Sequence, residues 1–404
     1  MMLLLIALSA AQAQPHNPTI VVTGQRIEDA EAALKSCLAR NCPPNEDIDA
    51  TLRLAETQLL AGKYHPARTT LLASLRRNKQ HADAYPIPVS DLYRANGKVA
   101  AHLGIDGDYY RSTWGIYSTL KNGLPSDDYR KYQAKMEIAE MVYRTRGHPR
   151  ARYYYEMISR EARKDGRPDI AAIADLRSAI RHLPPGSEMQ VAAIRKIADL
   201  SGPEMRAPVL EAKLALARVA YQKGDDAAGN AIRDEMNRLN IKRPMLIYSP
   251  PYTMLERELD SGSEFAFPFQ PPPPTGGEPG GATSQGGAAV TSNLNLGQWS
   301  STKRIPGNFE DMWVDISFNI NKDGRVEDAK IIHSKGNIFW TRPLMKSLTL
   351  RRYTAGKPGD PGSMRTERYT YTAAWDKGTA THLAERSPKA RVEFLDLSDI
   401  AASD

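Results

Sequence analysis

Residues 312–321 read Met-Trp-Val-Asp-Ile-Ser-Phe-Asn-Ile-Asn, and this segment decides the fold of the C-terminal part of the chain. Apolar and polar residues alternate along it, which is typical of a β-strand with one packed face and one face in water. Residues 321–324 follow, and their Asp-Gly pair supplies the positive φ angles that a tight hairpin turn needs. A second strand is predicted over Arg325–His333. On the first strand the packed face is Val314, Ile316, Phe318 and Ile320, and the wet face is Asp315, Ser317 and Asn319.

Two further elements complete this unit. Thr341 can cap a helix that tolerates Pro343 in its first turn, and the buried stripe of that helix is Leu344, Met345 and Leu348. Arg365–Trp375 alternates again and predicts another strand, with Arg368, Thr370 and Thr372 on its polar face. The sequence therefore predicts a small α+β domain over residues 301–380, followed by a C-terminal tail over residues 381–404.

The order strand, Asp-Gly hairpin, strand, helix, strand, and above all the run Trp313–Ala329, resembles the C-terminal domain of TonB energy-transducer proteins over about residues 306–375. In that family the domain captures an extended receptor peptide by adding it as a strand to an exposed sheet edge. The resemblance implies that Arg365–Trp375 is this edge, and that TonB-dependent outer-membrane receptors or other envelope proteins are the partners. An ordinary protected edge strand is the alternative. The implied peptide-binding residues are Arg368, Tyr369, Thr370, Tyr371, Thr372 and Trp375.

Composition changes abruptly before this domain. Residues 261–300 contain four consecutive prolines, at 271–274, and then Thr, Gly, Ser, Gln and Ala in low-complexity order. Such a segment buries too little apolar surface to offset the entropy of ordering it. We therefore predict a disordered linker, which acts as a tether between two parts of the chain.

Residues 27–260 show apolar residues at helical spacing, interrupted by turn residues. The turn at Gly62 is followed by an aromatic residue and then by a small residue, Ala67, and a similar order follows Gly107. These segments resemble tetratricopeptide-like (TPR-like) helical hairpins, so we predict a degenerate α-solenoid, with an irregular helical domain as the alternative. The fold class is then multidomain, with an all-α helical-hairpin body and a small TonB C-terminal-like α+β domain.

The N-terminus predicts export. Residues 1–13 form a short apolar run that ends in Ala11-Gln12-Ala13, the pattern that signal peptidase accepts, and an uncleaved anchor is the rival interpretation. We expect a periplasmic protein without an integral membrane span after cleavage, beginning with an extended tail over residues 14–26. Within that tail, Ile20, Val21, Val22 and Thr23 resemble the peptide that TonB-dependent receptors offer, although a β-prone stretch without a role is the simpler alternative.

The only cysteines are Cys37 and Cys42. In an oxidising compartment we expect them to form a structural disulfide that closes a small loop after the first helix. A redox-active pair would require a spacing of two residues, and a metal site would require two further ligands, so neither is favoured.

The sequence offers no catalytic constellation. The eight histidines are dispersed, and Ser118-Thr-Leu-Lys121 lacks the companion motifs of penicillin-interacting enzymes. We therefore expect no enzyme activity, no metal and no cofactor. The net charge of +7 is spread along the chain, which argues against a nucleic-acid partner.

The predicted function is a non-enzymatic periplasmic protein–protein interaction protein, related to TonB-type outer-membrane transport, that captures an extended peptide at its C-terminal domain. The alternative is a structural scaffold of cell-envelope assembly, in which the C-terminal domain only docks onto the helical body.

Overall fold

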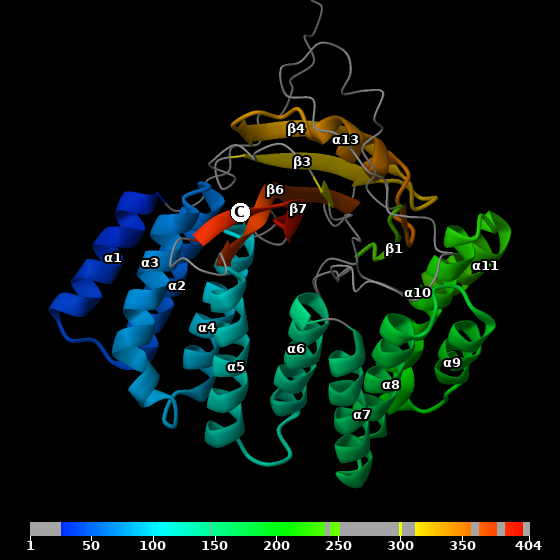
Figure 1. The fold of residues 1–404 in the computed structure, drawn as a ribbon, viewed down its shortest axis with the longest axis horizontal. Coiled ribbons are helices and arrows are strands. Elements are labelled where there is room, and N and C mark those ends of the chain that lie inside the picture. Colours follow the sequence, from blue (N-terminus) through cyan, green and yellow to red (C-terminus); the bar gives the residue numbers. More distant parts are fainter. Residues whose placement is uncertain are drawn as a thin grey trace, which may run out of the picture.

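The computed structural model describes residues 26–146, 148–238, 243–250, 299–300, 312–356, 363–377 and 384–398. The predicted signal peptide, almost all of the predicted N-terminal tail and nearly all of the predicted linker lie outside the described residues. Two bodies of structure remain, a long series of helices and a small antiparallel sheet region (Figure 1).

The helical body is an arc of stacked helices, and the predicted helical-hairpin organisation is confirmed (Figure 1). Each helix packs against the next, and α2 also packs on α4 and α8 on α10, as expected when hairpins stack side by side. The helices are α1 (Ile27–Ala39), α2 (Pro44–Leu60), α3 (Tyr64–Asn78), α4 (Pro86–His102), α5 (Asp106–Gly123), α6 (Tyr129–Arg146), α7 (His148–Lys164), α8 (Pro168–His182), α9 (Glu188–Ala198), α10 (Arg206–Gln222) and α11 (Asp226–Asn237).

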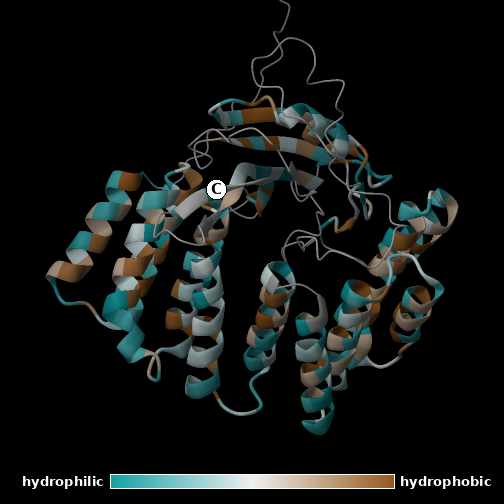
Figure 2. Ribbon diagram, in the orientation of Figure 1, coloured by the Kyte–Doolittle hydropathy of each residue, from teal (hydrophilic) through white to brown (hydrophobic). Residues whose placement is uncertain are grey.

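Apolar residues recur at intervals along the helices and gather where neighbouring helices meet (Figure 2). One cluster joins α2, α3 and α4 around Tyr64, Leu71 and Leu92, and a second joins α6, α7 and α8 around Tyr155 and Ile158. These clusters hold the arc together because each helix buries one apolar stripe against both of its neighbours. No helix among the described residues has the length and apolar composition needed to cross a membrane.

Glycines end several of the helices in the left-handed conformation, which a side chain disfavours. Gly62, between α2 and α3, has φ 69°, as the predicted turn requires. The turn predicted at Gly107 is misplaced, because α5 begins at Asp106 and the left-handed residue is Gly104, with φ 71°.

The sheet has the strand order β2-β7-β6-β3-β4 and is antiparallel throughout. The predicted hairpin, helix and third strand are all present. The prediction of a C-terminal tail over residues 381–404 is wrong, because most of this segment forms β7 in the same sheet. The elements are β2 (Trp299–Ser300), β3 (Trp313–Ile320), β4 (Val326–Lys335), α13 (Thr341–Thr349), β6 (Met364–Lys377) and β7 (Ala384–Asp396).

A short two-stranded ladder connects the helical body to the C-terminal region. β1 (Leu246–Tyr248) follows the helices in sequence and pairs with β5 (Arg352–Tyr353), which follows α13. Arg218 of α10 donates a hydrogen bond to the carbonyl of Ile247 at 2.9 Å. The helical part of the chain therefore contributes a strand to the C-terminal region.

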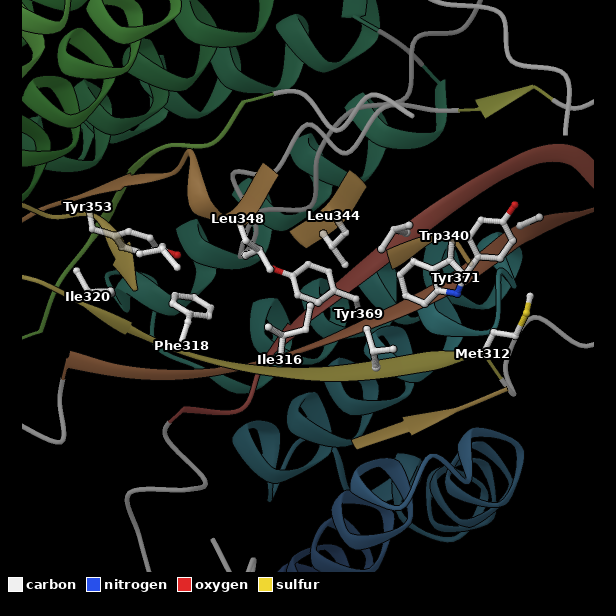
Figure 3. Close-up of a cluster of buried hydrophobic side chains, with 14 residues drawn as sticks. Met312, Ile316, Phe318, Ile320, Trp340, Leu344, Leu348, Tyr353, Tyr369 and Tyr371 are labelled. Atoms are coloured by element: carbon white, nitrogen blue, oxygen red, sulfur yellow. The ribbon is translucent and has the colours of Figure 1, made fainter. Parts of the chain in front are cut away.

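One face of the sheet packs under α13 and forms the core of the C-terminal domain (Figure 3). The predicted alternation places Val314, Ile316, Phe318 and Ile320 in this core, as expected. They meet Trp340, Leu344 and Leu348, and Tyr369 and Tyr371 from β6.

The opposite face was expected to be wet, and this prediction holds for Asn319, which is exposed, but is wrong for the rest of the face. Asp315 and Ser317 of β3 are 3% and 4% exposed, and Arg368, Thr370 and Thr372 of β6 are 2% exposed or less. These residues are buried because the polar face of the sheet lies against the helical body, at the ends of α2 to α5 (Figure 1).

The predicted disulfide is present between Cys37 and Cys42, whose Cα atoms are 5.2 Å apart. Cys37 lies near the end of α1, and Cys42 lies just before α2 begins at Pro44. The bond therefore fixes the turn between the first two helices.

Replacing Gly104 should destabilise the protein more than replacing Gly166 does. Both glycines have similar positive φ, 71° and 66°, so alanine costs about 1 kcal/mol at either position. A Cβ at Gly104 would also collide with the Ala373 carbonyl of β6, whereas a Cβ at Gly166 meets nothing within 4 Å. We expect Gly104→Ala to cost about 1–3 kcal/mol more than Gly166→Ala in urea unfolding. Equal losses of stability would show that the Ala373 carbonyl does not lie close enough to Gly104 to exclude a Cβ.

Candidate functional site

The strand that was predicted to be a peptide-receiving edge lies inside the sheet. β6 pairs with β3 on one side, and with β7 on the other from Glu367↔Asp396 to Lys377↔Ala384. The prediction that Arg365–Trp375 is an exposed edge is therefore wrong, because a later segment of the same chain occupies it. The alternation of Val392 and Phe394 with Arg391 and Glu393 is the sequence signal that could have revealed β7.

The six residues predicted to bind a peptide are divided between two faces. Tyr369 and Tyr371 lie in the core beneath α13 (Figure 3). The side chains of Arg368, Thr370 and Thr372 are buried toward the helical body, and Trp375 is 38% exposed with the Arg386 guanidinium over its ring. Ile20, Val21, Val22 and Thr23 lie outside the described residues.

The far edge of the sheet, β4, has features that discourage strand addition. Its pairing with β3 has two irregularities of register, and Asp328 has φ 54°. Charged residues, among them Glu327 and Lys330, are exposed along it. Bulges and charges of this kind are how natural sheets protect an edge.

Three arginines of the sheet bind backbone carbonyls at the ends of helices. Arg368 donates to the carbonyl of Leu59 at 2.7 Å, in the last turn of α2. Arg386 donates to Leu103 at 3.1 Å, and Arg391 to Ala101 at 3.4 Å, both at the end of α4. The last carbonyls of a helix lack partners within the helix and carry the negative end of its dipole, so cations are favoured there. The sheet thus caps two helices of the body.

Besides the Leu59 carbonyl of the body, Arg368 contacts two side chains of the neighbouring strand β3 at the interface. It forms a two-pronged ion pair with Asp315 on the neighbouring strand, at 2.7 and 2.8 Å. Its guanidinium carbon lies 3.8 Å from the ring centroid of Trp313, which packs among the residues of α2, α3 and α4. Because both partners of the ion pair are buried, each depends on the other for its charge to be tolerated.

Thr370 joins two side chains of the body. Its hydroxyl lies 2.7 Å from the Tyr64 hydroxyl and 3.0 Å from Nδ1 of His102. Burial lowers the pKa of His102, Glu393 opposes this effect and neighbouring arginines add to it, and the resulting pKa is about 4. His102 is therefore neutral in the folded protein at neutral pH. Tyr64 is the aromatic residue of the predicted Gly62 turn, and its hydroxyl forms a hydrogen bond with Thr370 of the docked sheet.

Glu393 of β7 is a buried carboxylate between two arginines. Arg144, from the last turn of α6, and Arg391, from β7 itself, both form ion pairs with it. Burial raises the pKa of Glu393, but the two arginines outweigh this effect and hold the pKa at about 2. Arg391 also pairs with Asp106 at the start of α5, at 2.8 Å. β7 is therefore fixed to the helical body by buried charges.

A groove lies in the helical body at the ends of the helices that are remote from the sheet. The cavity has a volume of about 500 Å³ and is lined mainly by α4, α6 and α8, with Glu211 from α10. On α4 the lining residues fall between Ile87 and Arg94, whereas the sheet contacts Ala101 and His102. Docking of the sheet leaves this groove open.

The groove contains both charged and apolar side chains. Ile87 and Tyr129, on its rim, are 37% and 51% exposed, which is unusual for large apolar side chains of the body. Burial raises the pKa of Asp91 and of Glu137, and Arg94 between them opposes this effect. Sequence reasoning did not find these residues, because they come together only when three hairpins stack.

The polar lining of the groove consists of carboxylates, arginines, tyrosines, Ser90 and Gln133. Its lining residues include no histidine or cysteine, and the hydroxyl of Ser90 donates to the carbonyl of Ile87 at 2.7 Å. Elsewhere in the described residues, Cys37, Cys42 and Glu46 have metal-ligand atoms within 4.8 Å of one another, but the two sulfurs are bonded together.

No family model matches this chain, and no curated protein matches it. Among solved structures, it is similar to BtubC (BKLC) from P. vanneervenii, at TM-score 0.39 and 16% identity, over 53% of this chain and 89% of that one. It is also similar to the apo form of RapI, at TM-score 0.35 and 13% identity, over 51% and 72% of the two chains. The Rap conjugation gene regulator of the plasmid pLS20, in complex with the Phr* peptide, gives TM-score 0.32 and 15% identity over 53% and 58%. TM-scores this low carry no argument about function.

Removing Arg368 should cost far more stability than removing an exposed arginine. Arg368→Leu leaves Asp315 buried without its partner, and we expect a loss of about 3–5 kcal/mol in urea unfolding. Arg53→Leu, which breaks the exposed pair with Asp49, should cost less than about 1 kcal/mol. The double variant Arg368→Leu/Asp315→Leu should be more stable than the sum of the single losses predicts. Strict additivity would contradict the proposed pairing.

Acid should weaken the interface, and His102 should account for part of the effect. The folded state holds the pKa of His102 near 4, whereas the unfolded value is near 6.5, so the unfolded chain binds more protons between these values. Stability should therefore fall as pH drops from about 6.5 to 4, by up to about 3 kcal/mol. Glu393 adds a further loss as pH falls from about 4.5 toward 2.

The measurement is the free energy of unfolding at intervals from pH 7 to pH 4, for the natural protein and two variants. His102→Gln should flatten the slope above pH 4, and His81→Gln, outside the interface, should leave it unchanged. A slope that survives His102→Gln would assign the acid effect to other groups.

Proposed function

We propose that this chain is an exported, non-enzymatic interaction protein whose helical groove binds a segment of a partner polypeptide. The observation that carries the proposal is the groove between α4, α6 and α8, which stays open and has exposed apolar side chains on its rim. Its volume of about 500 Å³ suits a few residues of a partner, because ligand pockets of this size enclose several side chains. The partner's segment would bury Ile87 and Tyr129.

In this proposal the C-terminal domain is a fixed part of the scaffold. Its buried charges bind the ends of α2 and α4, and Glu393 binds Arg144 of α6. A domain that must move to capture a peptide would leave these charges without partners, which is costly. This observation favours the docked scaffold over strand capture, for which β7 would first have to leave β6.

We also propose that the C-terminal domain is related to the TonB C-terminal domain, and that the protein acts in the periplasm. The order hairpin, helix, strand supports the first statement. The disulfide between Cys37 and Cys42 supports the second, because disulfides persist in oxidising compartments. TonB-dependent receptors are one class of partner that this setting suggests.

Site-specific photo-crosslinking in intact cells tests where the partner binds. A benzoyl-phenylalanine at Tyr129, in the groove, should crosslink to a polypeptide, and adding Ile87→Asp should abolish the product. The matched control is Tyr153 of α7, which is 59% exposed and does not line the groove. A third probe at Lys330 reports on the β4 edge.

The three probes give distinct outcomes. Crosslinks at Tyr129 that depend on Ile87 support groove binding. Crosslinks at Lys330 alone would replace the proposal by strand addition at β4, and equal products at Tyr129 and Tyr153 would show that contacts are nonspecific.

A further inference from the structure

Four arginines line the groove, and three of them are neutralised by close carboxylates. Arg94 donates to Asp91 at 2.6 Å and to Glu137 at 3.2 Å. Arg130 binds Asp128 with two nitrogens, and Arg167 binds Asp169 in the same way, at 3.1 and 2.9 Å. The N–H donors of these guanidinium groups already bind carboxylates, so a ligand gains little from them.

Arg177 of α8 is different. Its closest carboxylate oxygens, on Glu140 and Glu211, are each 3.9 Å away, which is too far for a hydrogen bond. Glu140 is 3% exposed and already accepts a hydrogen bond from Arg181 at 3.1 Å. Among the described residues, the guanidinium of Arg177 therefore makes no hydrogen bond, although its side chain is only 25% exposed. Arg177 is thus a largely buried cation whose N–H donors can bind an anion that enters the groove.

The other end of the groove is apolar. Ile87 and Tyr129 lie at the first turns of α4 and α6, and Leu120 of α5 lines the cavity beside them. Arg177 lies farther along the arc, on α8. The groove thus has exposed apolar side chains, Ile87 and Tyr129, at one end. At the other end lies Arg177, a cation that makes no hydrogen bond within the described part of the chain.

We propose that the segment bound in the groove carries an acidic side chain that pairs with Arg177, together with an apolar side chain that covers Ile87 and Tyr129. Neighbouring helices lie about 8–10 Å apart, so the two contacts are separated by about three to five residues of extended chain. The proposal rests on groove binding as the function and adds the chemistry of the partner. A carboxylate can accept two parallel bonds from one guanidinium, which gives both affinity and orientation.

The probe is a display library of random dodecapeptides, selected in parallel on the full chain and on its variants. Selection on the natural protein should enrich Asp and Glu over Lys and Arg, three to five positions from a large apolar residue. Arg177→Gln should lose the acidic preference, and Arg177→Glu should reverse it toward basic residues. Arg160→Gln is the control, because Arg160 lies on α7 and does not line the groove.

The best selected peptide is then synthesised with a fluorescent label and titrated by anisotropy. Arg177→Gln should weaken its binding by about tenfold or more, the usual effect of losing a charge-assisted bond, and Arg160→Gln should not change it. Thermal unfolding of each variant confirms that it is folded. Arg177→Gln removes no hydrogen bond but does remove the 3.9 Å ion pairs with Glu140 and Glu211, and Glu140 keeps its hydrogen bond from Arg181. Retained affinity in Arg177→Gln would overturn the proposal.

The same experiment separates this inference from the proposed function. Selected peptides that lose affinity in Tyr129→Ser but show no acidic preference would refute the role of Arg177 and leave groove binding intact. Peptides that ignore both Tyr129→Ser and Arg177→Gln would refute both.

Discussion

The structure depends on arginine side chains that project from one face of a β-sheet and bind the ends of helices. A helix ends with carbonyl groups that lack partners and carry partial negative charge, and burying such an end without a partner is costly. Arg368 adds a charged donor to the Leu59 carbonyl of α2, which also accepts from the Gly62 N–H, and Arg386 donates to the Leu103 carbonyl at the end of α4. A polar sheet face and two polar helix ends can therefore be buried together. An apolar sheet face could not do this, because it offers no donors.

This interaction explains why a sheet with a typical water-facing pattern is buried on both sides. Aromatic and aliphatic side chains pack on the α13 side of the sheet. On the body side, charged groups and hydroxyls are buried in ion pairs and hydrogen bonds, such as those of Arg368 with Asp315 and of Thr370 with His102. Buried charge pairs contribute little net stability, but they penalise wrong arrangements strongly. The position of the sheet on the arc therefore depends on Arg368, Asp315 and Glu393 as well as on Trp313, which packs among apolar residues of α2, α3 and α4.

The same arrangement determines which surfaces are available to a partner. β7 fills the edge of β6 and is held to the body by Glu393 and Arg391. β2 in turn pairs with part of the outer side of β7, so within the described strands the irregular β4 forms the opposite edge of the sheet. The helices, in contrast, use only one of their ends for docking. Their other ends form the groove, where the carboxylates nearest to Arg177, on Glu140 and Glu211, lie 3.9 Å away, too far for a hydrogen bond.

The sequence by itself determined the local elements. The alternation around Ile316, the Asp-Gly turn at Gly324 and the helical spacing of the body each depend on residues that are near one another in the chain, and all of these elements are present. The disulfide of Cys37 and Cys42 was predictable for the same reason. Only the tertiary structure decided that Arg368 and Thr370 face a helical body, that β7 closes the edge of β6, and that Ile87, Tyr129 and Arg177 share a groove. These features depend on contacts between residues tens to hundreds of positions apart. Periodicity shows which residues share a face, but it does not show what that face will meet.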